Sequence, residues 1–344
     1  MTTHDPVPSN STDHARRRLL LAASSGALMA YSLPRTASAQ SDWPNKPIRL
    51  FAAQAPGSSN DTTARALATY LSIQLKTPVA VENKPGGIGM IAADAVARSN
   101  PDGYTLLITL HSQLAQAPVL LSNPAIDTSK DLIPVGAYST GLSPAAVKKD
   151  LPVKNLKELI ALSKTRPITV GNYGIGSGWQ LMIAQLAEDT GGEFTLVNYK
   201  GTGPMMVDLM AGNIDIGAGS LAGLTPGIQK GAIRPLFMLN GDSKNPVLPG
   251  IPNWVEEGFT GPAYQDLREY NMVLAPAGTP AKIIDTLGDL INRSATESEE
   301  VKSVLALLGI PDHKPLTGTA LKEMIARVWP IYQNMTRKLN IKVN

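Results

Sequence analysis

One stretch, residues 47–71, constrains the fold more than any other, because a strand pattern passes through a short polar loop into a helix pattern. Residues 48–52 alternate as in a strand with one buried face. After the loop, apolar residues recur along one helical stripe, at Ala64, Leu67, Ala68, Leu71 and Leu75. A strand that enters a helix in this way is the repeating unit of an α/β fold.

The loop between them, residues 55–61, is suited to a small anion. Ser58, Ser59 and Asn60 are favourable N-cap residues, and Asp61 places a favourable charge in the first turn. The N–H groups at the beginning of a helix point outward and can bind a carboxylate without any lysine or arginine. An ordinary turn whose serines only cap the helix explains the same residues, so both interpretations stay open.

The alternation of strand and helix patterns continues along the chain and predicts an α/β fold with mostly parallel sheets. Two further strand-to-helix loops, residues 173–179 and 199–204, combine glycine with a hydroxyl group beside a predicted helix. In open α/β sheets such loops gather at the carboxyl ends of the strands, where ligands bind. Trp179 and Tyr199 are interpreted either as walls for an aromatic or aliphatic ligand or as core residues. Gly174, Gly176 and Gly178 lack the spacing of a dinucleotide site, because Trp179 stands at the last position of that motif.

Residues 1–39 resemble an export signal. Arginines at 16–18 precede an apolar run at 19–30, and Ala-Ser-Ala at 37–39 before Gln40 fits a cleavage site. The run is too short to be a permanent membrane anchor. The arginines resemble a twin-arginine signal, but Ala15 and Leu19 stand where that motif has other residues, so an ordinary secretory route stays open.

The predicted mature chain is close to neutral, because four arginines and two aspartates of a chain with net charge +3 lie in the leader. It has no basic stripe, which argues against a nucleic-acid partner, and no other run long enough for membrane insertion. The absence of cysteine excludes disulfides, thiolate metal sites, cysteine nucleophiles and a lipidated anchor.

Catalytic groups are scarce. Beyond the leader the histidines are His111, which follows a predicted strand and can line a cleft, and His313, which we expect in solvent. One histidine makes neither a metal site nor a proton relay, so no metal or cofactor is expected. Asp94, Asp208 and Asp215 are interpreted as surface groups or caps. No nucleophile elbow, Walker loop or H-E-x-x-H motif is present, and the sequence does not indicate an enzyme.

Several motifs stand in order along the mature chain: WPNKPIRL at 43–50, APGSSND at 55–61, VENKPGG at 81–87, PDGYTLL at 101–107, YKG at 199–201 and LAPAGTP at 274–280. Together they resemble the Bug family, the extracytoplasmic solute receptors of tripartite tricarboxylate transporters. The similarity covers nearly all of the mature chain.

The resemblance implies a two-lobed periplasmic-binding-protein fold of type II with the ligand in the cleft between the lobes. Residues 40–141 with 264–344 would form lobe 1, and residues 142–263 lobe 2. It implies that a ligand carboxylate is held by residues 56–61 and by the loop after Leu110. The second lobe would select the part of the ligand that lies beyond this carboxylate. The implied ligand-binding residues are Pro56, Gly57, Ser58, Ser59, Asn60, Asp61, His111, Ser112, Ser177, Gly178, Trp179, Tyr199, Thr202, Gly203 and Ser220.

The chain departs from the family pattern at several of these positions. Ser58 replaces the usual second glycine of its loop, and residues 111–114 replace a threonine-histidine stretch. Trp179 replaces a smaller or polar residue, which favours a flat aromatic acid or a shorter cleft. An Asp-Asn pair often found near Ser220 is missing, and its absence argues against an amino-acid ligand.

The favoured hypothesis is a periplasmic receptor, a monomer, that closes on a di- or tricarboxylate or an aromatic acid and delivers it to membrane permease subunits. The alternative is a receptor of the same shape that presents the solute to a sensor kinase.

Overall fold

The computed structural model of the chain describes residues 1–4, 43–241 and 244–341. The arginines and the cleavage position of the predicted leader lie outside the described residues. The chain divides into a unit of residues 1–43 and a unit from Pro44 onward, which contains both sheets described here. Within the described part of the chain, no helix combines the length and apolarity needed to cross a membrane.

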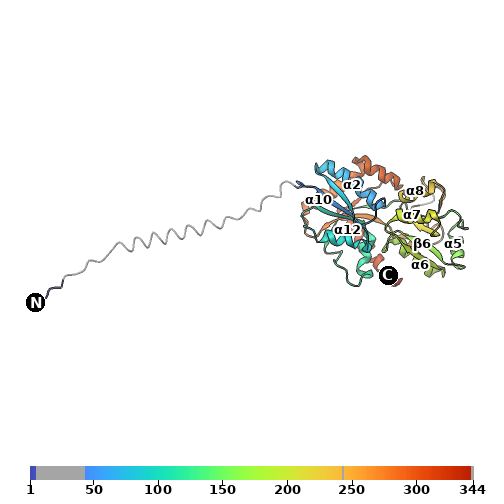
Figure 1. Ribbon diagram of the computed structural model, residues 1–344, viewed down its shortest axis with the longest axis horizontal. Helices are drawn as coiled ribbons and strands as arrows, with labels where there is room; N and C mark the ends of the chain where they lie inside the picture. The colour runs from blue at the N-terminus through green and yellow to red at the C-terminus, as the bar shows by residue number, and fades with distance from the viewer. Residues whose placement is uncertain (5–42, 242–243, 342–344) are drawn as a thin grey trace. The chain divides into compact units, whose positions relative to one another are not determined.

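The first sheet has six strands in the order β11-β4-β10-β3-β1-β2. Its strands are β1 (Ile48–Ala52), β2 (Val79–Asn83), β3 (Thr105–Leu110), β4 (Leu132–Ser139), β10 (Tyr270–Pro276) and β11 (Leu316–Thr317). The surrounding helices are α2 (Ser59–Leu75), the 3-10 turn η1 (Gly87–Gly89), α3 (Met90–Ala97), α4 (His111–Leu120), α10 (Ala281–Glu297), α11 (Glu299–Leu307) and α12 (Gly318–Lys338) (Figure 1).

The second sheet has five strands in the order β7-β6-β8-β5-β9. They are β5 (Pro144–Lys148), β6 (Ile168–Asn172), β7 (Phe194–Asn198), β8 (Ile216–Ala218) and β9 (Ile233–Met238). The helices α5 (Leu156–Ser163), α6 (Gly178–Thr190), α7 (Thr202–Ala211) and α8 (Leu221–Gln229) surround this sheet, and the short α9 (Pro262–Gln265) packs on α6.

The α/β fold class is confirmed, but the expectation of mostly parallel sheets is wrong. β1 is parallel to β2 and β3, and β6 is parallel to β7 and β8. β10 runs antiparallel to β3 and β4, and β5 runs antiparallel to β8 and β9. These antiparallel strands border the two passages of the chain between the sheets, from β4 to β5 and from β9 to β10. A strand that enters a sheet from the other sheet has no crossover helix to fix a parallel direction.

The two passages lie side by side, because the N–H of Thr140, just after β4, donates to the carbonyl of Glu269, just before β10, at 3.1 Å. The hydroxyl of Thr140 contacts the same carbonyl at 3.3 Å. A change in the angle between the sheets must therefore pass through this pair of segments.

Two helices that the sequence did not predict stand at these sheets. α4 begins at His111 directly after β3, where a loop was expected, and no side chain caps it. α8 follows Ser220, where only a strand exit was expected, and it contains Pro226. The first has no turn signal before it and the second has a helix breaker inside it, so neither has the usual helix boundaries.

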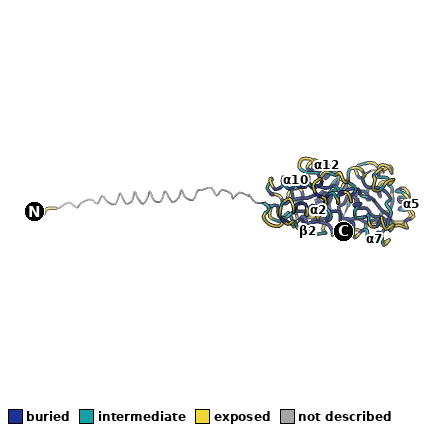
Figure 2. The backbone as a smooth tube through the Cα atoms, turned by 90° about the horizontal axis from the view of Figure 1, so that it is seen from above, coloured by how far each residue is buried: buried dark blue, intermediate teal, exposed yellow. Residues whose placement is uncertain are grey.

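Trp179 lies in the core of the second sheet. Its side chain is fully buried, and its indole N–H donates to the carbonyl of Gly171 at 3.0 Å. Its ring packs against Phe237 and Trp254, with centroids 6.2 and 6.4 Å away. The interpretation of Trp179 as a wall of the ligand site is therefore wrong. Figure 2 shows how buried residues of this kind fill the interior while exposed residues follow the outer loops and helices.

Asp215 also lies inside the fold, so its interpretation as a surface group or cap is wrong. Its carboxylate accepts two hydrogen bonds from Arg166, at 2.7 and 3.0 Å, and pairs with Lys148 at 2.8 Å. Thr169 of β6 donates to it from the backbone N–H and from the hydroxyl. Burial alone raises the pKa of this carboxyl, but these donors outweigh it and hold the pKa well below its usual range.

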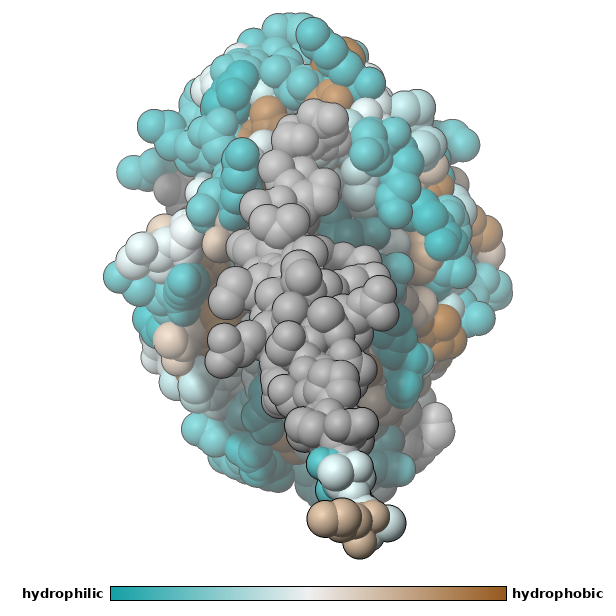
Figure 3. Space-filling view, turned by 90° about the vertical axis from the view of Figure 1, so that its left-hand side faces the viewer, coloured by the Kyte–Doolittle hydropathy of each residue, from teal (hydrophilic) through white to brown (hydrophobic). Residues whose placement is uncertain are grey.

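The exposed surface has few large hydrophobic side chains. On the face in Figure 3 hydrophilic residues predominate and the hydrophobic ones are scattered.

His313, expected in solvent, is half-buried, and its Nε2 accepts the N–H of Ser139 at 3.0 Å. That expectation is wrong because the loop containing His313 packs against the end of β4.

Candidate functional site

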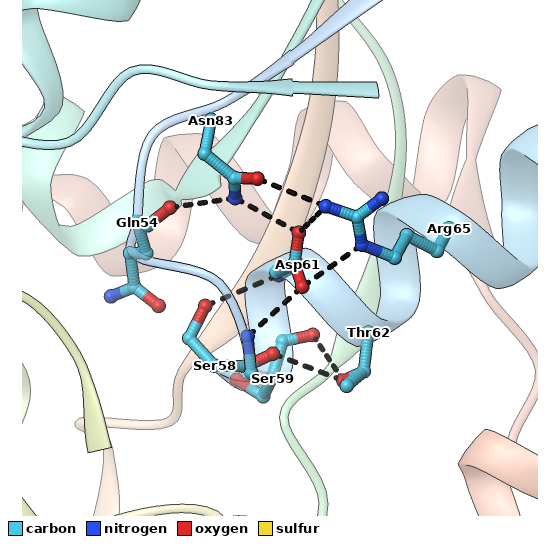
Figure 4. A network of polar contacts seen from close by, with 8 residues as sticks. Gln54, Ser58, Ser59, Asp61, Thr62, Arg65 and Asn83 are labelled. Carbon is cyan, nitrogen blue, oxygen red and sulfur yellow. Dashed lines mark hydrogen bonds and ion pairs between the residues drawn. The ribbon is translucent and has the colours of Figure 1, made fainter. Parts of the chain in front are cut away.

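The loop at the beginning of α2 is held by its own polar groups (Figure 4). Ser58 is the N-cap, and its hydroxyl accepts the N–H of Asp61 at 3.2 Å. The carboxylate of Asp61 accepts the N–H of Gly57 at 3.0 Å and pairs with Arg65 at 2.9 Å. Burial raises the pKa of the Asp61 carboxyl. Hydrogen bonds from Arg65, Gly57 and Asn83 lower this pKa by more than burial raises it, so it lies below its usual value. The predicted capping role of this loop is confirmed.

The backbone N–H groups of Ser59 and Asn60 have no acceptor among the described residues. Within the same part of the chain, the Ser59 hydroxyl donates no hydrogen bond. The Asn60 side chain, by contrast, is fully buried and donates to Asn271 of β10 at 3.3 Å. Ser59 therefore presents free donors at a helix N-terminus, where an anion is favoured.

Ser59 lines a small polar cavity of about 10 Å³. The residues around this cavity come from segments next to the first sheet and from segments next to the second. Its lining is Gln54, Ser59, Leu110, Thr140, Ser143, Tyr173, Thr202, Gly219, Ser220 and Glu269. Thr202 is the first residue of α7 and Ser220 is the N-cap of α8. Three helix N-termini thus meet at one cavity, which has room for about one water-sized group.

A larger cavity, of about 210 Å³, shares Gln54 and Tyr173 with the small one. Its other lining residues follow β1, β2, β6 and β7 or begin α4, and are Ala53, Gly86, Gly87, Ile88, Gly89, Gln113, Gly174, Ile175, Asn198, Tyr199 and Lys200. Loops after parallel strands meet here, as expected for ligand sites in open α/β sheets. Cavities of about 240 and 430 Å³ elsewhere border residues 239–268 and the β4–α10 region. The second of these lies beside the first residues of α10 and α12, but neither is lined by loops that follow parallel strands.

Direct contact between the two sides closes the site. The N–H of Ala55 donates to the carbonyl of Lys200 at 3.1 Å. At Gly201 an added Cβ would lie 3.3 Å from the Cβ of Ser58. The structure is therefore in a closed arrangement, with the loops at 55–58 and 200–201 touching.

Glu269, which no pattern in the sequence singled out, also lines the small cavity. Its Oε1 accepts the N–H of Gly178 at 2.6 Å, and its Oε2 accepts the hydroxyl of Ser112 at 2.7 Å. Tyr173 contacts Oε1 at 3.4 Å. Burial raises the pKa of Glu269 to about 7, despite these donors. A charged residue just before the buried strand at 270–276 was the available signal.

The structure brings together only part of the predicted set. Ser59, Thr202 and Ser220 line the small cavity, and Tyr199 lines the larger one. The donors of Ser112 and Gly178 are occupied by Glu269. The remaining predicted residues do not line either cavity: Pro56, Gly57, Ser58, Asn60, Asp61, His111, Ser177, Trp179 and Gly203. Ser177 caps α6, and its hydroxyl also donates to Asn172 at 2.7 Å.

His111 is fully buried, so its predicted place in the cleft wall is wrong. Its Nε2 lies 2.8 Å from the carbonyl of Arg268, and its ring packs edge-on against Tyr270 and Tyr332. Burial lowers the pKa of His111 to about 4, so the ring is neutral at physiological pH. α4 turns this side chain into the core instead of toward the cavity.

Comparisons with known proteins agree with this geometry. A model of the tripartite tricarboxylate transporter family receptor matches residues 63–319. A UPF0065 protein of Bordetella bronchiseptica is 35% identical over 276 residues, which cover 80% of this chain and 79% of that protein. Protein BugT of Bordetella pertussis is 31% identical over 280 residues, covering 80% of this chain and 83% of BugT.

Two solved structures have similar folds. The periplasmic binding protein BugD is 27% identical with a TM-score of 0.76, covering 88% of this chain and 100% of BugD. An R. palustris protein solved with adipate is 27% identical with a TM-score of 0.78, covering 88% of this chain and 100% of that one.

Proposed function

The chain belongs to the tripartite tricarboxylate transporter receptor family, and from that premise we propose that it is a periplasmic receptor that closes on a small carboxylate and delivers it to membrane permease subunits. The observation that carries the proposal is the free donor set of Ser59, which faces Thr202 and Ser220 across a closed polar cavity. The adipate bound to the R. palustris relative supports a carboxylate as the ligand class.

The proposed recognition uses neutral donors. A ligand carboxylate would accept the N–H group and the hydroxyl of Ser59, at the positive end of the α2 dipole. Thr202 and Ser220 would complete the site when the sheets close, each beside another helix N-terminus. Hinge closure of this kind is the usual motion of two-lobed binding proteins. We propose lobes of residues 40–141 with 264–344 and of residues 142–263, joined by the two passages between the sheets.

Export and assembly belong to the same proposal. The mature chain would begin at Gln40 after signal cleavage and act in the periplasm as a monomer, without catalytic turnover. Determination of the N-terminal residue of the exported protein tests the cleavage position. Export in a strain that lacks the twin-arginine system distinguishes the two routes.

Thermal unfolding of the mature protein against a panel of aliphatic and aromatic carboxylates tests the function. A ligand at a hundred times its dissociation constant adds about 2.7 kcal/mol to the free energy of unfolding. Ser59→Ala is expected to weaken binding of the best ligand by roughly 1–3 kcal/mol, because it removes a hydrogen bond to a charged group.

Ser129→Ala is the matched control, since Ser129 is exposed and its hydroxyl bonds, among the residues that the structure describes, to Asp127 alone. Equal affinity in the Ser59→Ala variant and the wild type would remove Ser59 from the site. A panel without any stabilising acid, for a protein free of co-purified ligand, would overturn the proposed function.

A further inference from the structure

The cavity of about 240 Å³ beside residues 239–268 shares no lining residue with the two cavities of the candidate site. It lies at the passage from β9 to β10, because it is lined by the residues directly after β9 and by residues 253–255 and 264–268. Its volume far exceeds that of one water molecule and is a little below the range of about 300–1,000 Å³ that is typical of drug-sized ligands. The cavity therefore has room for a small molecule.

The charge of this cavity comes from Arg268. Among the described residues that line it, Arg268 is the charged one, and no acid stands beside it. Across the described ranges, no carboxylate pairs with Arg268 and no hydrogen bond uses its guanidinium. Its backbone is held in place, because its carbonyl accepts the hydroxyl of Tyr332 at 3.3 Å. A guanidinium presents several N–H donors in a planar fork that matches a carboxylate.

A second donor without an acceptor is the indole N–H of Trp254. Trp254 lines the cavity and is 1% exposed, and its Nε1 has no hydrogen-bond partner in the part of the chain that the structure describes. The neighbouring indole in the same aromatic cluster, that of Trp179, does donate, to the carbonyl of Gly171 at 3.0 Å. Buried polar groups almost always have a partner, so an orphaned donor at the wall of a cavity points to a bound acceptor.

The other polar side chains of the lining are mostly used. Asn240 bonds to the backbone of residues 141 and 143 with both ends of its amide, at 2.7 and 2.9 Å. Asn253 likewise bonds to backbone groups with both ends, and the hydroxyl of Tyr264 donates to an aspartate of α6 at 2.7 Å. Apart from the exposed amide of Gln265, the side-chain groups that remain for a ligand are donors.

Apolar surface lies beside these donors. It comes from Leu239 and Leu267 and from the rings of Trp254 and Tyr264, all of which are buried. An anion with an apolar body would cover this surface, which a bare inorganic ion would leave exposed. Mostly apolar walls with a few placed polar groups are the usual composition of small-molecule sites.

We propose that this cavity is a second binding site, separate from the cavity beside α2, for a small organic carboxylate. The carboxylate binds the guanidinium of Arg268 and accepts the indole N–H of Trp254, and the apolar body packs against Trp254 and Leu267. The site adds to the proposed receptor function and does not depend on it, because the two sites share no residue.

The indole N–H signals of the four tryptophans, in a proton–nitrogen NMR spectrum of the mature protein, report on this site directly. Trp254→Phe identifies the Trp254 signal by its loss; if that variant does not fold, replacement of the other tryptophans one at a time identifies the signal by elimination. Benzoate is expected to move the Trp254 signal downfield in a saturable way, because the N–H gains an acceptor. Benzamide, which has the same shape without the charge, should leave the signal in place.

Three variants place the effect. Arg268→Gln should weaken the binding of benzoate, measured at the Trp254 signal, by at least about tenfold, because it removes a hydrogen-bonded counter-charge. Arg327→Gln is the matched control, because Arg327 is an exposed arginine of α12 outside this cavity. Ser59→Ala should also leave the effect intact, since Ser59 lines the other site.

Several outcomes would overturn the inference. One is a Trp254 signal that neither benzoate nor cyclohexanecarboxylate moves. Others are an equal shift with benzamide, which would show that the charge has no role, and an equal shift with inorganic phosphate, which would show that the apolar body has none. Loss of the shift in Ser59→Ala would mean that benzoate acts from the cleft. Should Arg268→Gln not fold, the comparison of benzoate with benzamide decides. None of these results affects the proposed receptor function, which the carboxylate panel and Ser59 test separately.

Discussion

Gly201→Ala tests whether closure of the two sides is needed for binding. Gly201 precedes α7 with φ +130° and ψ 171°, a conformation open essentially to glycine alone. A Cβ at this position would lie 3.3 Å from the Cβ of Ser58 on the opposite loop. Ser58 is almost fully buried and is fixed by its N-cap bond, so it has little room to move aside.

Two costs follow, and they affect different measurements. The backbone strain is present in the open and the closed arrangement and lowers the free energy of unfolding by about 1–3 kcal/mol. The contact with Ser58 exists only when the loops touch, so it opposes closure. Overpacking of this kind costs typically 1–3 kcal/mol, which corresponds to a roughly 5- to 150-fold loss of ligand affinity.

Two glycines of the same helix separate these costs. Gly212 ends α7 with φ +80° and has nothing within 4 Å of an added Cβ, so Gly212→Ala should lower the melting temperature and leave affinity unchanged. Gly203 has open space and no positive φ, so Gly203→Ala should change neither. Calorimetric titration with the best ligand of the panel gives the affinities. Unchanged affinity in Gly201→Ala, or an equal loss in Gly212→Ala, would refute the reasoning.

Other variants test the interior. Asp215→Asn should lower the free energy of unfolding, measured in urea, by about 2–3 kcal/mol. This loss is smaller than that expected for a wholly buried ion pair, because Arg166 is partly exposed. Asp94→Asn, which removes an exposed ion pair with Arg98, should lower the same free energy by about 0.3–0.5 kcal/mol. The folded-state pKa of Asp215 is depressed, so its contribution to stability is complete above the unfolded pKa near 4 and is lost as pH falls through the lower folded value. The difference in the free energy of unfolding between the wild type and Asp215→Asn should therefore become smaller in acid. Ser58→Ala removes the N-cap of α2 and should lower the free energy of unfolding by about 1 kcal/mol in the same assay. Replacement of a serine that caps no helix should leave this free energy unchanged. Trp179→Phe should lower the melting temperature while leaving ligand affinity unchanged, and a weaker affinity would restore Trp179 to the cleft wall.

The sequence predicted the repeating units well, because strand alternation, helical stripes and caps are local. The loop of Ser58 and Ser59 was identified from cap chemistry alone, and the structure adds that the first serine caps the helix while the second faces the cavity. Local patterns contain no information about which side of a strand meets another segment. Trp179 and His111 were therefore misassigned, since only the packing of α6 and α4 decides that both side chains turn inward.

Glu269 could not be found from spacing, because its partners are far away in the chain. Ser112 is 157 residues before it and Gly178 is 91 residues before it. The same holds for Asp215, whose partner Arg166 precedes it by 49 residues. Both acids stood out in the sequence only as charges next to strands, a position that is shared by many exposed residues.

Closure of the two sides involves Glu269, because its carboxylate accepts a hydrogen bond from each side at once. Ser112 belongs to α4, which packs on the first sheet, and Gly178 begins α6, which packs on the second. An opening that separates these helices breaks one of the two bonds, and hydrogen bonds to charged groups are worth about 1.5–3 kcal/mol each. Glu269 therefore contributes to the stability of the closed arrangement through these two bonds.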